Sequence, residues 1–119
     1  MSERTNDYLS YMRLVLGLYI LKSLQQGPAH GNKIAEEIKR RTKNYYSPNT
    51  NLLYPLLRIM EEKNYIVGVW DNPATRGRRI YTITQVGSAY IPELEAKLKD
   101  RLEEAEARIE ILKSDLLES

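Results

Sequence analysis

Apolar residues recur at helical spacing in the first third of the chain. Residues 7–24 are apolar over more than half of the helical circumference, which is typical of a helix buried by more than one neighbour. Residues 32–41 have a narrower apolar side made of Ile34, Ala35 and Ile38. Gly27-Pro28 separates the two stretches. The pattern therefore predicts two helices with a break between them.

A third amphipathic stretch covers residues 47–66. Its apolar residues follow the i, i+3, i+4, i+7 spacing of one buried helical face: Leu53, Leu56, Leu57 and Met60. Ser47 followed by proline is typical of a helix start, because serine caps a helix and proline fits its first turn. A start at Asn49 fits the same pattern, so both remain open. Asn64 is expected to end this helix, since asparagine tolerates the left-handed backbone found there.

Two strands are predicted after the third helix. Residues 66–70 and 79–84 are rich in β-branched and aromatic side chains. The basic connection 71–78 joins them, so the pattern predicts an antiparallel hairpin. Trp70 is expected to pack against the core, and Thr84 to cap the helix that follows.

A long helix is predicted from residue 85 to about 117, on the order of 50 Å at 1.5 Å per residue. Its apolar residues alternate in spacings of four and three, the coiled-coil repeat: Ile91, Leu98, Leu102, Ala105, Ile109, Leu112 and Leu116, with Leu94 beside the seam. A lone helix of this length is not held by propensity alone. We therefore expect these residues to pair with their copies in a second subunit.

The order helix, helix, helix, hairpin, helix predicts a fold class that is mainly α (α+β). It is a winged helix-turn-helix with an antiparallel β-hairpin wing and a long C-terminal coiled-coil-like dimerisation helix. The predicted division is residues 1–84 for the winged helix-turn-helix and 85–119 for the dimerisation helix.

Composition excludes several classes of function. The 119 residues include no cysteine and one histidine, which excludes disulfides, thiolate metal sites and multi-histidine metal sites. Adjacent acidic pairs such as Glu36-Glu37 diverge by about 100° on a helix and do not share a site. No Gly-rich phosphate loop or nucleophile motif is present. We expect no enzyme activity, no cofactor and no metal.

Hydropathy predicts a cytoplasmic protein that does not enter a membrane. No run approaches the ~18 apolar residues that a membrane span needs. The N-terminal segment is polar and carries acidic residues, unlike a secretory signal or a transit peptide.

Charge is distributed unevenly along the chain. Residues 1–38 carry four basic and four acidic side chains, residues 39–84 carry nine and three, and residues 85–119 carry five and nine. The balances are 0, +6 and −4, which sum to the net charge of +2. A positive middle third is expected if that part faces a polyanion.

Polar residues on the third helix are candidates for reading DNA. The outward or N-terminal positions are Asn49, Thr50, Asn51, Tyr54 and Arg58. Asparagine pairs with adenine and arginine with guanine in the major groove, and a tyrosine hydroxyl suits a phosphate. The alternative is an ordinary solvated face.

Basic residues elsewhere are candidates for backbone or minor-groove contacts. They are Arg76, Arg78 and Arg79 around the hairpin turn, and Lys33, Lys39 and Arg40 on the second helix. The alternatives are a solubilising turn, a structural role for Arg79, and a basic helix end that complements the helix dipole. His30 is interpreted as a capping or turn residue.

These motifs together resemble the PadR family of bacterial transcriptional regulators, in its short branch with a single C-terminal helix. The similar stretches lie between about residues 14 and 90: GPAHG, then SP and LYPLL followed by Glu61-Glu62, then YIVGVW and RGRRIYTITQVG. Two departures are Asn32, where the family has an aromatic residue, and a longer segment between Ser-Pro and Leu-Tyr-Pro.

The resemblance implies a homodimeric repressor that binds double-stranded DNA at a palindromic operator. It also implies release by a small aromatic or drug-like effector that binds near the dimer interface, for which Tyr8 and Tyr11 are the candidate residues. The alternative function is a winged-helix adaptor for protein–protein interaction without specific DNA binding.

Overall fold

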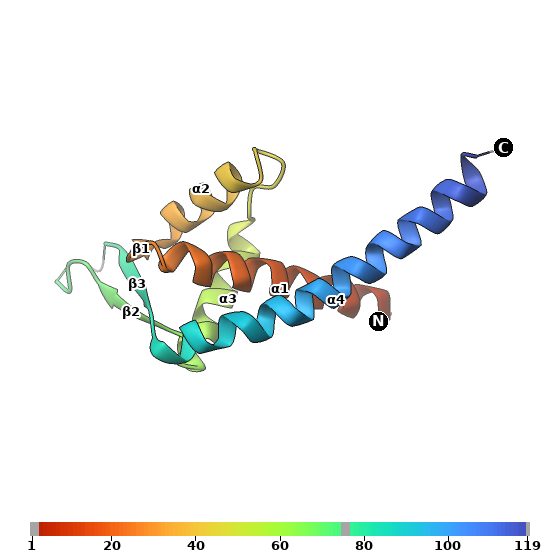
Figure 1. Cartoon of the computed structure of the whole chain (residues 1–119). Helices are drawn as coiled ribbons and strands as arrows, with labels where there is room; N and C mark the ends of the chain where they lie inside the picture. Colours follow the sequence, from red (N-terminus) through yellow and green to blue (C-terminus); the bar gives the residue numbers. More distant parts are fainter. Residues whose placement is uncertain (1–2, 75–76, 119) are drawn as a thin grey trace.

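The computed structural model describes residues 3–74 and 77–118, with side chains from Ser10 onward. Its elements are α1 (Glu3–Leu24), β1 (Ala29–His30), α2 (Gly31–Arg41), α3 (Thr50–Glu62), β2 (Ile66–Trp70), β3 (Arg79–Ile83) and α4 (Gln85–Leu116). The molecule is elongated, 65 × 32 × 27 Å. The β2–β3 turn and the C-terminal end of α4 lie at opposite ends (Figure 1).

The predicted hairpin is confirmed, and a third strand extends it. β2 pairs with β3 in antiparallel register from Ile66 opposite Ile83 to Trp70 opposite Arg79. β1 pairs with the other edge of β3, which gives the order β1-β3-β2. Two residues are too few to show the alternation that identifies a strand in a sequence, so β1 was not predicted.

The core lies where α1 crosses α2, α3 and the first half of α4. Its largest fully buried side chains come from α1, α2, α3 and β2: Leu16, Ile20, Leu21, Ile34, Ile38, Leu53, Leu57 and Ile66. The apolar face predicted for α3 is confirmed, since all four of its residues are buried. Ile91 and Leu94 of α4 belong to the same core, so the core includes residues on both sides of position 84.

The ends of α3 resolve the uncertainty about its start. Asn49 is the N-cap, and its side-chain Oδ1 accepts a hydrogen bond from the backbone N–H of Asn51 at 2.7 Å. The helix begins after the Ser-Pro pair, and Ser47 is not its cap. At the other end Asn64 has φ 67°. The N–H of Tyr65 donates to the carbonyl of Met60, the bond that closes a Schellman motif.

The start of α4 packs against the residues that follow the C-terminal end of α3. Thr84 is the N-cap of α4, as predicted, and its Oγ1 accepts from the N–H of Gly87 at 3.0 Å. The same hydroxyl lies 2.6 Å from the carbonyl oxygen of Asn64, to which it donates. A Cβ at Gly87 would lie 2.1 Å from the carbonyl oxygen of Tyr65. Only glycine therefore allows the two backbones to approach this closely.

The prediction that Trp70 packs against the core is wrong. Its side chain is 39% exposed at the end of β2. The guanidinium of Arg79, its partner across the hairpin, lies 5.2 Å from its ring centre in a cation–π contact. Trp70 therefore packs on the guanidinium of Arg79 at the end of the hairpin.

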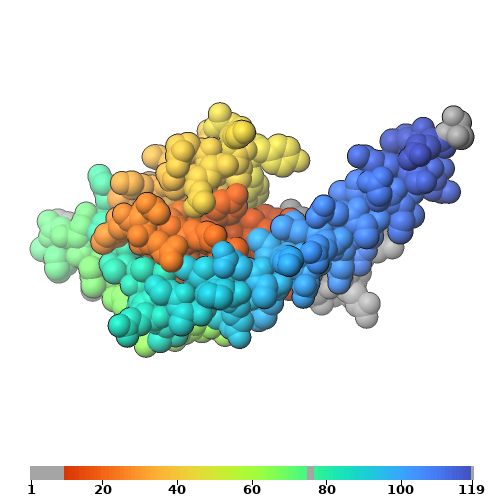
Figure 2. Space-filling view, viewed as in Figure 1, coloured from red at the N-terminus to blue at the C-terminus, as the bar shows by residue number. Residues whose placement is uncertain are grey.

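The second half of α4 leaves the domain. Figure 2 shows it as a projection beyond the globular part. Its seam residues Leu102, Ile109, Leu112 and Leu116 are exposed.

Candidate nucleic-acid interface

The outer side of α3 presents polar groups to solvent. Asn51, Tyr54 and Arg58 are exposed, and Thr50 is the exposed first residue of the helix. The opposite side is held in the core. Asn49 uses its side-chain oxygen to cap the helix, so it contributes to the start of α3 and lies at its tip.

Contacts between α2 and α3 fix the position of Tyr54. The Tyr54 hydroxyl donates to Oδ1 of Asn32 at 3.3 Å. A Cβ at Gly31 would lie 2.7 Å from the Tyr54 ring. The glycine at the start of α2 thus lets the ring lie against its backbone, which sets the spacing of the two helices.

The wing lies beside the start of α2. Arg78 and Asp71 close its base, where the Arg78 N–H donates to Oδ1 of Asp71 at 3.0 Å and the Asp71 N–H donates to the Arg78 carbonyl at 2.8 Å. Nη1 of Arg78 lies 3.4 Å from Nε2 of His30. His30 is the N-cap of α2, as interpreted from the sequence. Arg76 lies outside the described residues.

Arg79 has a structural ion pair instead of a free guanidinium. Its Nε and Nη2 donate to the two carboxylate oxygens of Glu61 at 3.0 and 2.7 Å. The hydrogen bond from Arg79 lowers the pKa of Glu61 below its usual value. Glu61 is in the last turn of α3, so this bidentate pair ties the wing to the helix it flanks.

The basic residues of α2 lie at its two ends. Lys33 is in the first turn, and its N–H donates to Nδ1 of His30 at 3.4 Å. Lys39 and Arg40 are exposed in the last turn. Arg40 forms an ion pair with Glu37, which lowers the pKa of that carboxyl. The structure thus places Asn51, Tyr54 and Arg58 on the outer side of α3 and Arg78 beside His30 at the start of α2. Lys33 lies next to Gly27 and Pro28 in the connection that follows α1, and Lys39 and Arg40 are nine and ten residues after the N-cap of α2.

The candidates for dimerisation and effector binding occupy other surfaces. Ile91 and Leu94 are buried within the single chain, Leu98 is half-buried, and Leu102, Ala105, Ile109, Leu112 and Leu116 follow along the projecting part. Tyr11 is half-buried in the groove between α1 and α4, with the guanidinium of Arg101 5.7 Å from its ring centre. The side chain of Tyr8 lies outside the described part.

Sequence reasoning did not find the contacts that hold this surface together. Asn32–Tyr54, His30–Arg78 and Glu61–Arg79 join residues 22, 48 and 18 positions apart. No local pattern links such pairs. The sequence contains one signal for the Asn32–Tyr54 contact, because Asn32 stands where the family has an aromatic residue.

Comparison with known proteins agrees with this arrangement. The family model described as Transcriptional regulator PadR-like family matches residues 20–93. The chain belongs to this family of transcriptional regulators. It is a family of regulators and not of enzymes, as composition indicated.

Individual relatives support the assignment. A Lysinibacillus sphaericus protein named Uncharacterized protein X is 32% identical over 76 residues, which cover 63% of this chain and 70% of that one. The PadR-like transcription factor of Bacteroides fragilis superposes with a TM-score of 0.67 at 26% identity, over 87% of this chain and 98% of that chain. A transcriptional regulator from Clostridium thermocellum gives 0.62 at 25%, over 88% and 96%.

One solved PadR-family structure contains DNA. Bacillus subtilis PadR in complex with operator DNA has a TM-score of 0.58 and 24% identity, over 66% of this chain and 44% of that chain. At this identity the likeness shows the shared winged-helix fold.

Two absences hold for the described residues. Within residues 3–74 and 77–118, no helix is long and apolar enough to cross a membrane. In the same part of the chain, no three His, Asp or Glu side chains are grouped so as to hold a metal ion.

Proposed function

We propose that this PadR-family regulator is a homodimeric, sequence-specific DNA-binding repressor. α3 enters the major groove of each half-site, and the wing contacts the adjacent backbone or minor groove. The observation that carries the proposal is the fixed polar face of α3 beside Arg78 of the wing. Tyr54 is held by α2 and the wing is held to α3 by Glu61 and Arg79, so Tyr54 and the wing have fixed positions relative to α3.

The roles of individual residues follow from their positions. Asn51 and Arg58 are exposed on α3 and suit base edges, where a good bidentate pair discriminates by about 1–3 kcal/mol. Tyr54, Lys33 and Arg78 suit phosphates, which set the register. The operator bound by Bacillus subtilis PadR, a protein of the same fold, supports this reading for the present chain.

Dimerisation is proposed to use the projecting half of α4. Leu102, Ile109, Leu112 and Leu116 form an apolar line that the described residues leave exposed, by 41% at Leu102 and by 52–70% at the other three. Two copies of that line bury each other as in a coiled coil. The pairing places two α3 helices on a palindromic operator about one helical turn apart. Release of the DNA by a small-molecule effector is part of the same proposal.

Selection of bound fragments from genomic DNA, followed by fluorescence-anisotropy titration of the selected sequence, tests the proposal. We expect a palindromic sequence. We also expect an affinity that falls steeply with salt, because binding releases about 0.9 counterion for each contacted phosphate. Arg78→Gln should weaken binding about fivefold to tenfold and reduce the salt slope by about 1.

Arg108→Gln is the matched control, since Arg108 is an exposed arginine on the far half of α4. It should leave affinity unchanged. Equal affinity for selected and random DNA would instead support a protein–protein adaptor and overturn the proposal.

A further inference from the structure

The imidazole of His30 lies between the start of α2 and the wing. In the sheet His30 is opposite Ile80 of β3, and Arg78 is two residues before Ile80. His30 and Arg78 are therefore diagonal neighbours across the β1–β3 pair. Nε2 of His30 and Nη1 of Arg78 are 3.4 Å apart, so the short strand β1 brings together two nitrogen-bearing side chains from distant parts of the chain.

The other ring nitrogen of His30 already has a partner. Nδ1 accepts the backbone N–H of Lys33 at 3.4 Å and thereby caps α2. This N–H belongs to the first turn of the helix, where no helical carbonyl is placed to accept it. Nδ1 is therefore the acceptor of the ring and carries no proton.

The tautomer of His30 decides what its contact with Arg78 is. A neutral imidazole has one N–H, so a ring that accepts at Nδ1 carries its proton at Nε2. A guanidinium has donors only, so Nε2–H and Nη1–H then face each other as two donors. The opposite tautomer would let Nε2 accept from Arg78, but it would set two N–H groups against each other at the cap of α2. The capped tautomer therefore leaves two donors that converge.

The guanidinium of Arg78 keeps its charge available for a ligand. Its residue is exposed, and among the described residues no carboxylate lies within ion-pair distance of it. Asp71 accepts only the backbone N–H of Arg78. Arg79 differs, because both carboxylate oxygens of Glu61 bind its guanidinium. Of these two arginines of the hairpin, Arg78 is the one that a ligand can reach.

Two converging donors, one of them charged, match an anionic oxygen. An oxygen about 2.8 Å from both nitrogens replaces the donor–donor contact by two hydrogen bonds. On DNA such oxygens belong to the phosphates, which flank the groove that a helix occupies. The pair flanks α3 in this way. The wing is tied to α3 by an ion pair, and Gly31, which follows His30, lies against Tyr54 of α3.

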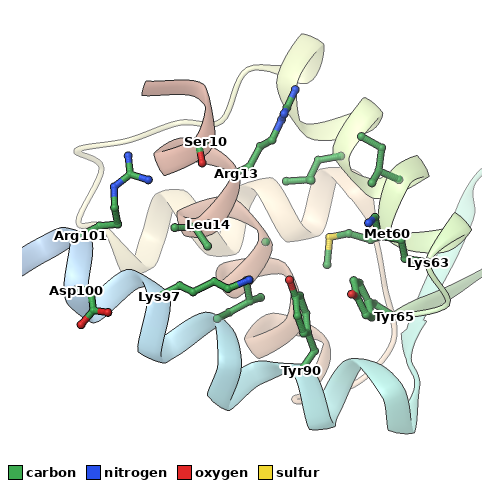
Figure 3. Close-up of a pocket in the computed structure, with 14 residues that line it drawn as sticks. Ser10, Arg13, Leu14, Met60, Lys63, Tyr65, Tyr90, Lys97, Asp100 and Arg101 are labelled. Atoms are coloured by element: carbon green, nitrogen blue, oxygen red, sulfur yellow. The ribbon is translucent and has the colours of Figure 1, made fainter. Parts of the chain in front are cut away.

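We propose that His30 and Arg78 together bind one phosphate of the DNA backbone, through Nε2–H and the guanidinium. His30 then has two roles, since Nδ1 caps α2 while Nε2–H fixes the register on the DNA. The inference rests on the proposed function, because the phosphate belongs to the operator. The site uses no residue of the cavity of about 530 Å³ between α1, α3 and α4, whose cations include Arg13, Lys63 and Lys97 (Figure 3).

Nitrogen NMR of the unmodified chain without DNA measures the tautomer. His30 is the only histidine in the sequence, so a sample labelled at histidine gives the signals of a single imidazole. At about pH 8, where an ordinary histidine ring is neutral, we expect the proton on Nε2 and a bare Nδ1. A proton on Nδ1 would overturn the inference, because Nε2 would then accept from Arg78 and the pair would need no further acceptor.

Replacement of single operator phosphates by neutral methylphosphonate locates the contact. For the unmodified chain we expect a position in each half-site at which the replacement weakens binding about fivefold to tenfold. His30→Ser, His30→Asn and Arg78→Gln should lose this sensitivity at the same position, with less than about a twofold effect left. Serine and asparagine are both preferred caps, as Asn49 is for α3, but neither reaches the position of Nε2. Circular dichroism checks that each variant is folded.

Arg58→Gln is the matched control for weakened binding. Arg58 is an exposed arginine of α3 proposed to contact a base. The variant should bind the operator more weakly and keep the full sensitivity at that phosphate. Loss of the sensitivity in Arg58→Gln as well would overturn the inference, since the effect would then follow weak binding in general.

Two further results separate this inference from the proposed function. Specific operator binding in which both His30 variants keep the sensitivity of the unmodified chain at every phosphate would overturn the inference alone. The same holds if the variants of His30 and Arg78 lose sensitivity at two different phosphates. A folded chain that binds no DNA would overturn the proposed function, and the phosphate site with it.

Discussion

The two halves of α4 carry one continuous apolar repeat but have different surroundings. In the first half Ile91 and Leu94 are each 6% exposed and belong to the core with α1. In the second half Ile109 is 52% exposed and Leu116 is 70% exposed. An apolar repeat in the sequence therefore does not tell whether its residues pack within the same chain or against another molecule. The first half is used inside the chain, and only the second half is left for another molecule.

The difference shows how α3, the proposed DNA-reading helix, is connected to the proposed dimer. The first half of α4 is fixed to the end of α3 through Thr84, Gly87 and Tyr65. The second half continues the same helix away from the domain (Figure 1). Pairing of two projecting halves would therefore set the separation of two α3 helices.

The largest expected effect is at the joint. Gly87→Ala places a methyl group 2.1 Å from a backbone oxygen of Tyr65, so the start of α4 must move. We expect a loss of about 3 kcal/mol or more in the free energy of unfolding, measured by urea denaturation.

Gly17→Ala is the matched control in α1. Its Cβ meets only a methyl carbon of Leu94, at 4.0 Å. Helix propensity predicts a stabilisation of up to about 1 kcal/mol. A similar loss in both variants would show that the joint is not special.

The next largest effect distinguishes the buried first half of α4 from its exposed second half. Leu94→Ala should cost about 2–5 kcal/mol of unfolding free energy, because Leu94 is buried in the core of the chain. Ile109→Ala/Leu112→Ala should leave the folded monomer intact and raise the dimer dissociation constant about a hundredfold or more. Analytical ultracentrifugation measures the second effect. A dimer that is lost with Leu94→Ala but unchanged in the double variant would reverse the assignment.

A smaller effect is expected from the cap that joins the helices. Thr84→Val keeps the shape of the side chain but removes the hydroxyl that accepts from Gly87 and donates to Asn64. We expect a loss of about 1–2 kcal/mol in thermal unfolding. Thr82→Val in the exposed part of β3 should be close to neutral. Equal losses would indicate a general effect of valine.

The smallest effect concerns surface ion pairs on each half. Lys22 and Glu95 approach to 2.9 Å with side chains 36% and 47% exposed. Lys22→Gln should therefore cost at most about 0.5–1 kcal/mol and lose its effect in high salt. Glu104→Gln, in an exposed 3.7 Å pair with Arg108, should have no measurable effect on unfolding of the monomer. A larger loss with Glu104→Gln would show that the far half is packed in solution.

The elements that periodicity and turn chemistry specify were predicted from the sequence. They include all four helices, the hairpin, the cap at Thr84 and the left-handed Asn64. The start of α3 was not fixed, because Ser47 and Asn49 are both good caps and only the fold shows which side chain reaches a helical N–H. The exposure of Trp70 was not predicted, because an apolar ring at a strand end is equally suited to the core or to a cation.

The candidate site was predicted in outline. Exposed polar residues such as Asn51 and Arg58 follow from the apolar face opposite them, which the sequence shows. The role of Arg79 does not, because its partner Glu61 is 18 residues away.

Sedimentation of the protein with a labelled palindromic operator and with a single half-site tests the central claim most directly. We expect two chains on the palindrome and at least a hundredfold weaker binding to the half-site, and Ile109→Ala/Leu112→Ala should remove most of that advantage. One chain per site, with equal affinity for the palindrome and the half-site, would contradict it.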